Sequence, residues 1–132
     1  MRLEEVGERK QQPLSVLVVE DHPPLRELIE NILNDAGYNV ITAADGNEAL
    51  RILDQSENSV DLLLTDLTMP GLTGAALVQQ FQQRSRDSGV VIMSGSYQGT
   101  ATTHPGTRFL QKPFTSKSLL AIVLQSLNDR LR

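Results

Sequence analysis

Three runs of apolar residues constrain the fold of this 132-residue chain more than any other feature of its sequence. The runs are VLVV at residues 16–19, LLL at 62–64 and VVIM at 90–93. None of them alternates between apolar and polar residues, as a strand with one solvated face would. Continuous runs are typical of parallel strands covered by helices on both faces of the sheet, which predicts an α/β architecture.

The segments around these runs complete an alternation of strands and helices. From Leu25 to Ala36, apolar residues recur at the spacing of one helix face, and Gly37 ends that helix. Similar patterns predict strands at 38–43 and 108–111 and helices at 46–55, 73–85 and 116–131. The predicted fold is therefore a doubly wound, five-stranded parallel sheet with helices on both faces, for which we expect the flavodoxin-like strand order 2-1-3-4-5.

The first and last of these helices carry apolar stripes that we expect to face the core. The residues of the two stripes are Leu25, Leu28, Ile29, Ile32, Leu33 and Ala36, and Leu120, Val123, Leu124, Leu127 and Leu131.

The composition fits one folded domain and argues against several classes of function. Hydrophobic residues make up 39% of the chain and charged residues 21%, which is ordinary for a globular protein. The net charge of −4 argues against a nucleic-acid partner, because phosphate binding favours a basic surface. The absence of Cys excludes disulfides and thiolate chemistry. No apolar stretch resembles a signal peptide or membrane span, so we expect a cytoplasmic protein without direct membrane contact.

The N-terminal segment differs in character from the rest of the chain. Residues 1–13 balance three acids against three bases and end at Pro13. We therefore expect residues 1–13 to be a linker or tail, and residues 14–132 to form the domain.

Polar side chains gather at one edge of the predicted sheet. Glu20 and Asp21 follow the first strand, Asp66 ends the third, Ser94 ends the fourth and Lys112 follows the fifth. Ligands bind at this edge in doubly wound sheets. Three adjacent carboxylates repel one another, and Mg²⁺, which prefers oxygen ligands, would relieve that repulsion. An aspartate beside Mg²⁺ can accept a phosphoryl group, whose oxygens an amine and a hydroxyl can neutralise.

The ordered set VVED, LLLTDLTMPG, MSGS and FLQKPF resembles the receiver domain of bacterial two-component response regulators. The resemblance extends over residues 14–131. It implies that Asp66 is the phosphoacceptor, that Asp21 binds Mg²⁺ directly and Glu20 binds it through water, and that the backbone carbonyl of Thr68 is a further ligand.

The same resemblance assigns three residues to the response that follows phosphorylation. Lys112 would pair with Asp66 or its phosphoryl group, and in this family the bond between this lysine and the next proline, Pro113, is typically cis. Ser94 would move toward the phosphoryl group, and Phe109 would be the switch aromatic that turns inward as Ser94 moves.

The implied function is that of a phosphoacceptor in a phosphorelay. The domain would take a phosphoryl group from a histidine kinase or a histidine phosphotransfer domain and later hydrolyse it, which makes it a self-modifying signalling domain rather than a turnover enzyme. The sequence is compatible with a stand-alone regulator or with the receiver of a hybrid sensor kinase, and we favour the second. The downstream partner and the oligomeric state stay open.

One segment departs from the family pattern. Between Ser94 and Lys112 the chain is short and contains Gly95, Gly99 and four threonines, with no apolar periodicity. Helix propensity is poor there, so we expect the fourth helix of the family to be shortened to about one turn or lost.

Three alternative functions are less well supported. A Mg²⁺-dependent aspartyl phosphohydrolase usually has a second aspartate two residues past its nucleophile, where this chain has Thr68. A nucleotide- or flavin-binding module needs backbone donors after the first strand, where this chain has an acidic pair followed by His22 and two prolines. The third alternative is a degenerate receiver that acts only as a protein-binding module.

Overall fold

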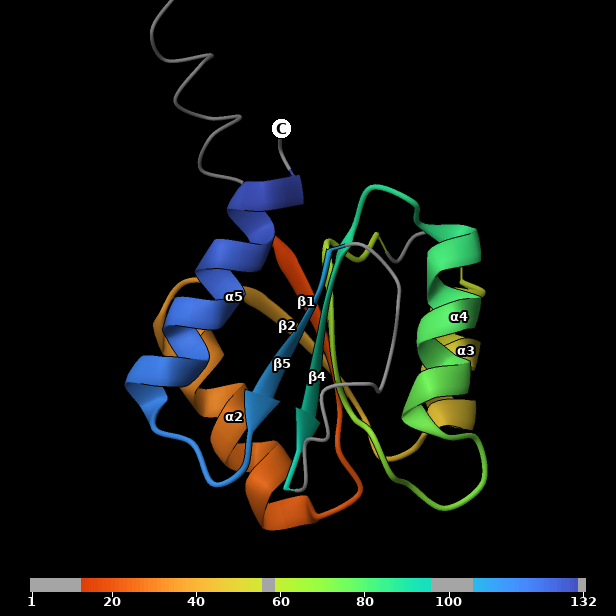
Figure 1. The fold of residues 1–132 in the computed structure, drawn as a ribbon, viewed down its shortest axis with the longest axis horizontal. Coiled ribbons are helices and arrows are strands. Elements are labelled where there is room, and N and C mark those ends of the chain that lie inside the picture. The colour runs from red at the N-terminus through yellow and green to blue at the C-terminus, as the bar shows by residue number, and fades with distance from the viewer. Residues whose placement is uncertain (1–12, 56–58, 96–105, 131–132) are drawn as a thin grey trace, which may run out of the picture.

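Five parallel strands form a single sheet in the computed structural model, which describes residues 13–55, 59–95 and 106–130 (Figure 1). The strands are β1 (Ser15–Val19), β2 (Asn39–Ala43), β3 (Leu62–Asp66), β4 (Gly89–Ser94) and β5 (Thr107–Gln111). Their order is β2-β1-β3-β4-β5, which confirms the predicted order. The three apolar runs lie in the three central strands, where both faces of the sheet are covered.

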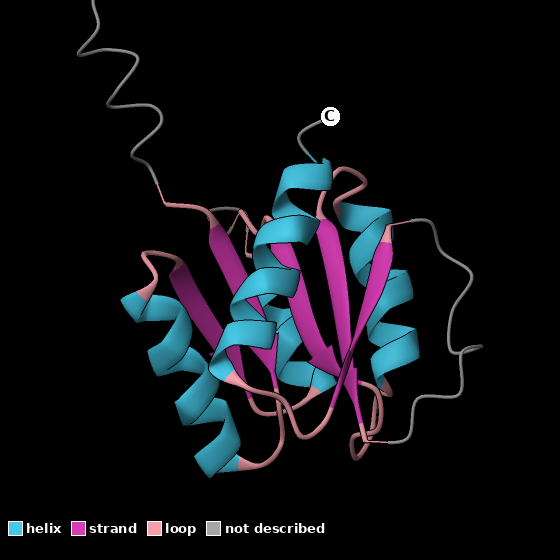
Figure 2. Ribbon diagram, turned by 60° about the vertical axis from the view of Figure 1, so that its left-hand side comes forward, coloured by secondary structure: helices cyan, strands magenta, loops and turns pink. Residues whose placement is uncertain are grey.

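Two pairs of helices cover the two faces of the sheet (Figures 1 and 2). Helices α2 (Pro23–Asp35) and α5 (Ser116–Arg130) pack on one face, and α3 (Gly46–Leu53) and α4 (Gly74–Arg84) pack on the other. Side chains alternate along each strand, so Val16 and Val18 face the first pair while Leu17 and Val19 face the second. The doubly wound architecture is therefore confirmed.

Capping residues fix where two of the helices begin. Asp45 accepts a hydrogen bond from the Glu48 backbone N–H at 2.8 Å, and the Glu48 carboxylate accepts one from the Ala44 backbone N–H. This arrangement is similar to a capping box, except that Glu48 accepts from the residue before the N-cap Asp45, and it starts α3 directly after β2. The Thr73 hydroxyl accepts from the Ala76 backbone N–H at 3.1 Å and starts α4 in the same way.

The prediction that the apolar stripes of α2 and α5 face the core was wrong for some residues at the edges of these stripes. Three of the residues in them are exposed: Leu28, Ala36 and Leu124. The leucines are each 53% exposed, and Ala36 lies at the helix end. On α5 the buried stripe instead follows Leu119, Val123 and Leu127, because a helix lying on a sheet buries a band narrower than all its apolar positions.

Some predictions fall outside the described residues. They concern the tail at residues 1–12, most of the segment expected to lack a fourth helix and the side chain of Leu131. Within the part of the chain that is described, no helix is long and apolar enough to cross a membrane.

Candidate functional site

The ends of β1 and β3 bring three carboxylates together. The register pairs Val19 of β1 with Thr65 of β3, so Glu20, which follows β1, lies beside Asp66, which ends β3. One oxygen each from Glu20, Asp21 and Asp66 lie within 4.8 Å of one another. Glu20 is 1% exposed and Asp66 is 7% exposed, whereas Asp21 faces solvent. A set of oxygen donors only, with one side open to water, suits a hard divalent cation.

Lys112 connects two of these carboxylates. Its Nζ lies 2.8 Å from Glu20 Oε1 and 2.7 Å from Asp66 Oδ1. The Lys112 backbone N–H donates to the carbonyl oxygen of Ser94 at 2.8 Å, which ties the lysine to the end of β4. The peptide bond from Lys112 to Pro113 is cis, as the family resemblance predicts. Four of the predicted site residues therefore meet at one edge of the sheet.

The buried setting shifts the pKa values of these groups in different directions. Burial and the neighbouring Glu20 carboxylate raise the pKa of Asp66 to about 7, against the opposing effect of Lys112. Burial also disfavours the charge on Glu20, but its contacts with Asp66, Lys112 and the His22 backbone N–H outweigh burial and lower the pKa of Glu20. Burial likewise opposes the charge on Lys112, but the two carboxylates raise its pKa. The site thus holds a Glu20–Lys112 ion pair beside a carboxyl group that titrates near neutral pH.

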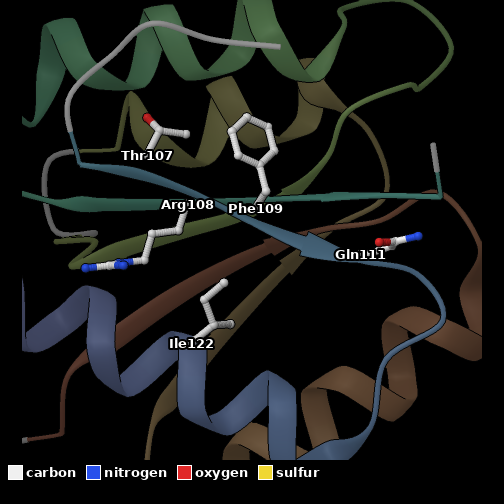
Figure 3. Close-up of a pocket in the computed structure, with 5 residues that line it drawn as sticks. All are labelled: Thr107, Arg108, Phe109, Gln111 and Ile122. Atoms are coloured by element: carbon white, nitrogen blue, oxygen red, sulfur yellow. The ribbon is translucent and has the colours of Figure 1, made fainter. Parts of the chain in front are cut away.

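Ser94 and Phe109 lie on the same face of the sheet. Ser94 ends β4 and is 8% exposed. Phe109 of β5 pairs with Ile92 and packs with it in the core beneath α3 and α4, and Ser94 follows Ile92 by two residues. Figure 3 shows Phe109 on the side of β5 that faces α4, opposite Arg108 and Ile122.

The hollow drawn in Figure 3 is separate from the acidic site. It has a volume of about 460 Å³ and is lined by Thr107, Arg108, Phe109, Gln111 and Ile122. Neither the three carboxylates nor Lys112 line it. The pocket and the acidic site are therefore different places, and the hollow in the surface does not mark the position of the charged groups.

The loop after β3 packs closely against the end of that strand. A Cβ atom at Gly74 would lie 2.0 Å from the backbone oxygen of Asp66, so only glycine fits where α4 begins. The Gly74 backbone N–H donates to the Leu67 carbonyl at 2.9 Å. Thr68 lies exposed in this loop, and its role as a carbonyl ligand stays a prediction. Gly74 was not singled out from the sequence. The only sign in the sequence that it matters is its spacing from Asp66.

Arg26 is a second residue that sequence reasoning missed. Its Nη1 donates a hydrogen bond to the backbone carbonyl oxygen of Glu20 at 2.8 Å. In the sequence Arg26 looks like an ordinary polar residue beside the apolar stripe of α2, and only the fold shows that it turns back toward the end of β1.

Comparison with known proteins agrees with this arrangement. Residues 16–124 match the response regulator receiver domain. The sensor histidine kinase RcsC of Salmonella typhimurium is 41% identical over 70 residues, 53% of this chain and 7% of that protein. The sensor kinase CckA of Brucella abortus is 32% identical over 120 residues, 88% of this chain and 13% of that protein.

A solved structure covers the same region. The receiver domain from the hybrid histidine kinase CckA has a TM-score of 0.76 at 34% identity, over 86% of this chain and 98% of that chain. The chain thus spans a small part of the curated kinases that it matches and nearly all of an isolated receiver domain.

Proposed function

The chain belongs to the response regulator receiver domain family of two-component systems, and on this premise we propose that Asp66 accepts a phosphoryl group from a phosphohistidine. One observation carries the proposal. Asp66 is buried at the end of β3, 2.7 Å from the Lys112 ammonium and within 4.8 Å of two more carboxylates. The donor would be a histidine kinase or a histidine phosphotransfer domain.

The reaction is a displacement at phosphorus. A carboxylate oxygen of Asp66 forms a bond to phosphorus as the bond from phosphorus to the donor's imidazole nitrogen breaks, and that nitrogen keeps the electron pair. The product is an acyl phosphate on Asp66. Lys112 already contacts this carboxylate and is placed to donate to a phosphoryl oxygen. Attack by water later returns the carboxylate and inorganic phosphate.

The three carboxylates would hold Mg²⁺. Asp21 and Asp66 would bind it directly, Glu20 would bind it through water, and the Thr68 carbonyl would add another oxygen. Their oxygen-only chemistry and mutual distances support this assignment. Bound Mg²⁺ would offset negative charge on the phosphoryl oxygens during transfer.

Ser94 and Phe109 would transmit the change. The Ser94 hydroxyl would move toward the phosphoryl group, and Phe109 would turn toward the space that it leaves. Their position on one face of neighbouring strands supports the coupling. In amide NMR spectra, Phe109 should then shift on phosphorylation in the wild type and shift much less in Ser94→Ala.

We also propose that residues 14–132 are the receiver of a hybrid sensor kinase and that residues 1–13 link it to the rest. Sensor kinases are among the relatives, and the chain spans only 7% and 13% of the two reported above.

Intact-mass spectrometry after incubation with acetyl phosphate and Mg²⁺ tests the central proposal. Wild type should gain about 80 Da, the mass of one phosphoryl group, and Asp66→Asn should gain nothing. The matched control is Asp87→Asn, which removes an exposed carboxylate before β4 at the opposite edge of the sheet and should behave like wild type. An adduct of equal yield in Asp66→Asn would refute the assignment. No adduct in wild type would favour a degenerate receiver.

A further inference from the structure

We propose that Arg26 is a positioning residue that sets the geometry of the acidic site, an inference that rests on the metal site of the proposed function. Arg26 lies in α2, and its guanidinium turns back toward the end of β1 to donate to the backbone carbonyl oxygen of Glu20 at 2.8 Å. It contacts the main chain at the junction between the strand and the exposed Asp21.

The other polar groups of Glu20 are also held. Its backbone N–H donates to the Ala43 carbonyl at 3.2 Å. Its two carboxylate oxygens accept from the His22 backbone N–H at 3.1 Å and from Lys112 Nζ at 2.8 Å. The Arg26 hydrogen bond completes this set, so every polar group of Glu20 has a partner.

Fixing this carbonyl also fixes the next residue. The carbonyl of Glu20 and the N–H of Asp21 belong to one planar peptide unit, so a hydrogen bond to the carbonyl sets the direction in which the chain enters Asp21. Glu20 is 1% exposed, and its carbonyl would lose its donor if the guanidinium were removed. The peptide would then rotate or admit water, because a buried carbonyl without a partner is costly. Rotation moves Asp21 away from the other two carboxylates, and a water held by fewer partners than the guanidinium leaves the peptide free to rotate.

The sign of the effect separates positioning from simple charge. The Arg26 guanidinium is a positive charge at the end of β1 and repels a divalent cation held there, so on Coulomb grounds alone its removal would tighten Mg²⁺ binding. If Arg26 acts by holding the Glu20–Asp21 peptide, its removal weakens Mg²⁺ binding instead. The two roles therefore predict opposite changes in one equilibrium constant.

Calorimetric titration with Mg²⁺ alone measures that constant. In Arg26→Ala the dissociation constant should rise roughly tenfold, the loss typical of removing a group that orients metal ligands. Arg26→Lys keeps the charge and one donor, and it should recover part of the affinity. Arg51→Ala removes an exposed cation from α3 on the other face of the sheet and should bind as wild type does. Urea unfolding of each variant shows whether it is folded at the titration temperature.

A second readout needs no metal. In EDTA, the amide resonance of Asp21 should move in Arg26→Ala and stay in place in Arg51→Ala, because only the first change frees the peptide unit. If the wild type binds Mg²⁺ and Arg26→Ala binds it as tightly or more tightly, the positioning role of Arg26 is overturned. The proposed metal site is then unaffected. A wild type that binds no Mg²⁺ would overturn the proposed metal site and this inference with it. If Arg26→Ala does not fold, Arg26→Met keeps most of the apolar stem without a donor and decides, since unchanged affinity and an unchanged Asp21 resonance there would count against positioning.

Discussion

At the scale of single residues, burial and charge oppose each other at Asp66. The strand holds its carboxyl group where water is scarce, and Glu20 adds a second negative charge. Lys112 offsets part of this, yet the pKa of Asp66 still rises to about 7. The same features that make the residue costly to ionise hold it beside an ammonium and two other carboxylates, which is the setting that the proposed phosphoryl transfer requires.

The raised pKa of Asp66 predicts how stability depends on pH. Between the ordinary value of 3.8 and about 7, folded Asp66 is protonated while unfolded Asp66 is ionised, so the folded state loses stability as pH rises through this window. Asparagine does not ionise. Measured in EDTA by urea unfolding, the stability of Asp66→Asn relative to wild type should therefore increase by about 1 to 3 kcal/mol from about pH 4 to about pH 8.

The contribution of Glu20 to stability has the opposite pH dependence and has to be separated from that of Asp66. Its lowered pKa contributes stability above the unfolded value, and that stability is lost as pH falls through the folded pKa. The pKa of Glu20 lies below its ordinary value of 4.5, so this contribution changes mainly at lower pH and stays nearly constant over most of the range in which Asp66 titrates. A stability difference that stays constant across the pH range would contradict the raised pKa of Asp66.

The close approach at Gly74 predicts a sharp steric effect. Gly74→Ala would place a Cβ atom 2.0 Å from the Asp66 carbonyl oxygen and 2.8 Å from the Leu67 Cα, both of which are backbone atoms. The start of α4 must then move away from β3, at a cost of about 1 to 3 kcal/mol or more in the free energy of unfolding. Gly95→Ala is the control in the same urea assay, because a Cβ atom there would lie within 4 Å of no other described residue apart from its chain neighbours. Equal stability of the two variants would show that the loop adapts freely.

At the scale of elements, each helix contributes a narrow band to the core and leaves the rest to solvent. On α5, Leu127 is 1% exposed and Leu124 is 53% exposed, although they lie three residues apart on the same helix. Leu119 and Leu120 are adjacent, so the sequence is compatible with two rotations of this helix about its own axis, each of which buries one of the two leucines. The contact with β4 and β5 selected the one that buries Leu119.

A matched pair of substitutions checks this orientation of α5. Leu127→Ala should lower the free energy of unfolding by about 2 to 5 kcal/mol, because it leaves a cavity in the core. Leu124→Ala should lower it by less than about 1 kcal/mol, because half of that side chain is already in water. Both keep a good helix former, so urea midpoints compare packing directly. Similar losses in the two variants would mean that the helix is turned differently.

At the scale of the whole molecule, the site exists only when the sheet is assembled. Its groups come from the ends of β1, β3, β4 and β5, separated by up to 92 residues in the Glu20–Lys112 contact. No local segment can hold three carboxylates and an ammonium in this arrangement. A cation that binds here should therefore bind the folded chain and not the unfolded one.

This linkage predicts that Mg²⁺ stabilises the protein. At a free concentration of about ten times its dissociation constant, Mg²⁺ should raise the free energy of unfolding by about 1.4 kcal/mol. Asp21→Asn removes the exposed carboxylate of the proposed metal site and should lose most of this gain, whereas Asp87→Asn should keep it. Urea unfolding with and without Mg²⁺ gives both numbers, and an equal gain in Asp21→Asn would place the cation elsewhere.

The residue pattern predicted the parallel sheet and the residues at its carboxyl edge, because unbroken apolar runs require two covered faces and because polar residues after parallel strands must share one edge. Only the folded chain shows which leucines of α2 and α5 are buried, that Gly74 leaves no room for a side chain, and that Arg26 reaches the Glu20 carbonyl. These features depend on how helices and strands that are distant in the sequence are oriented and packed against one another. A local pattern of residues does not determine that packing.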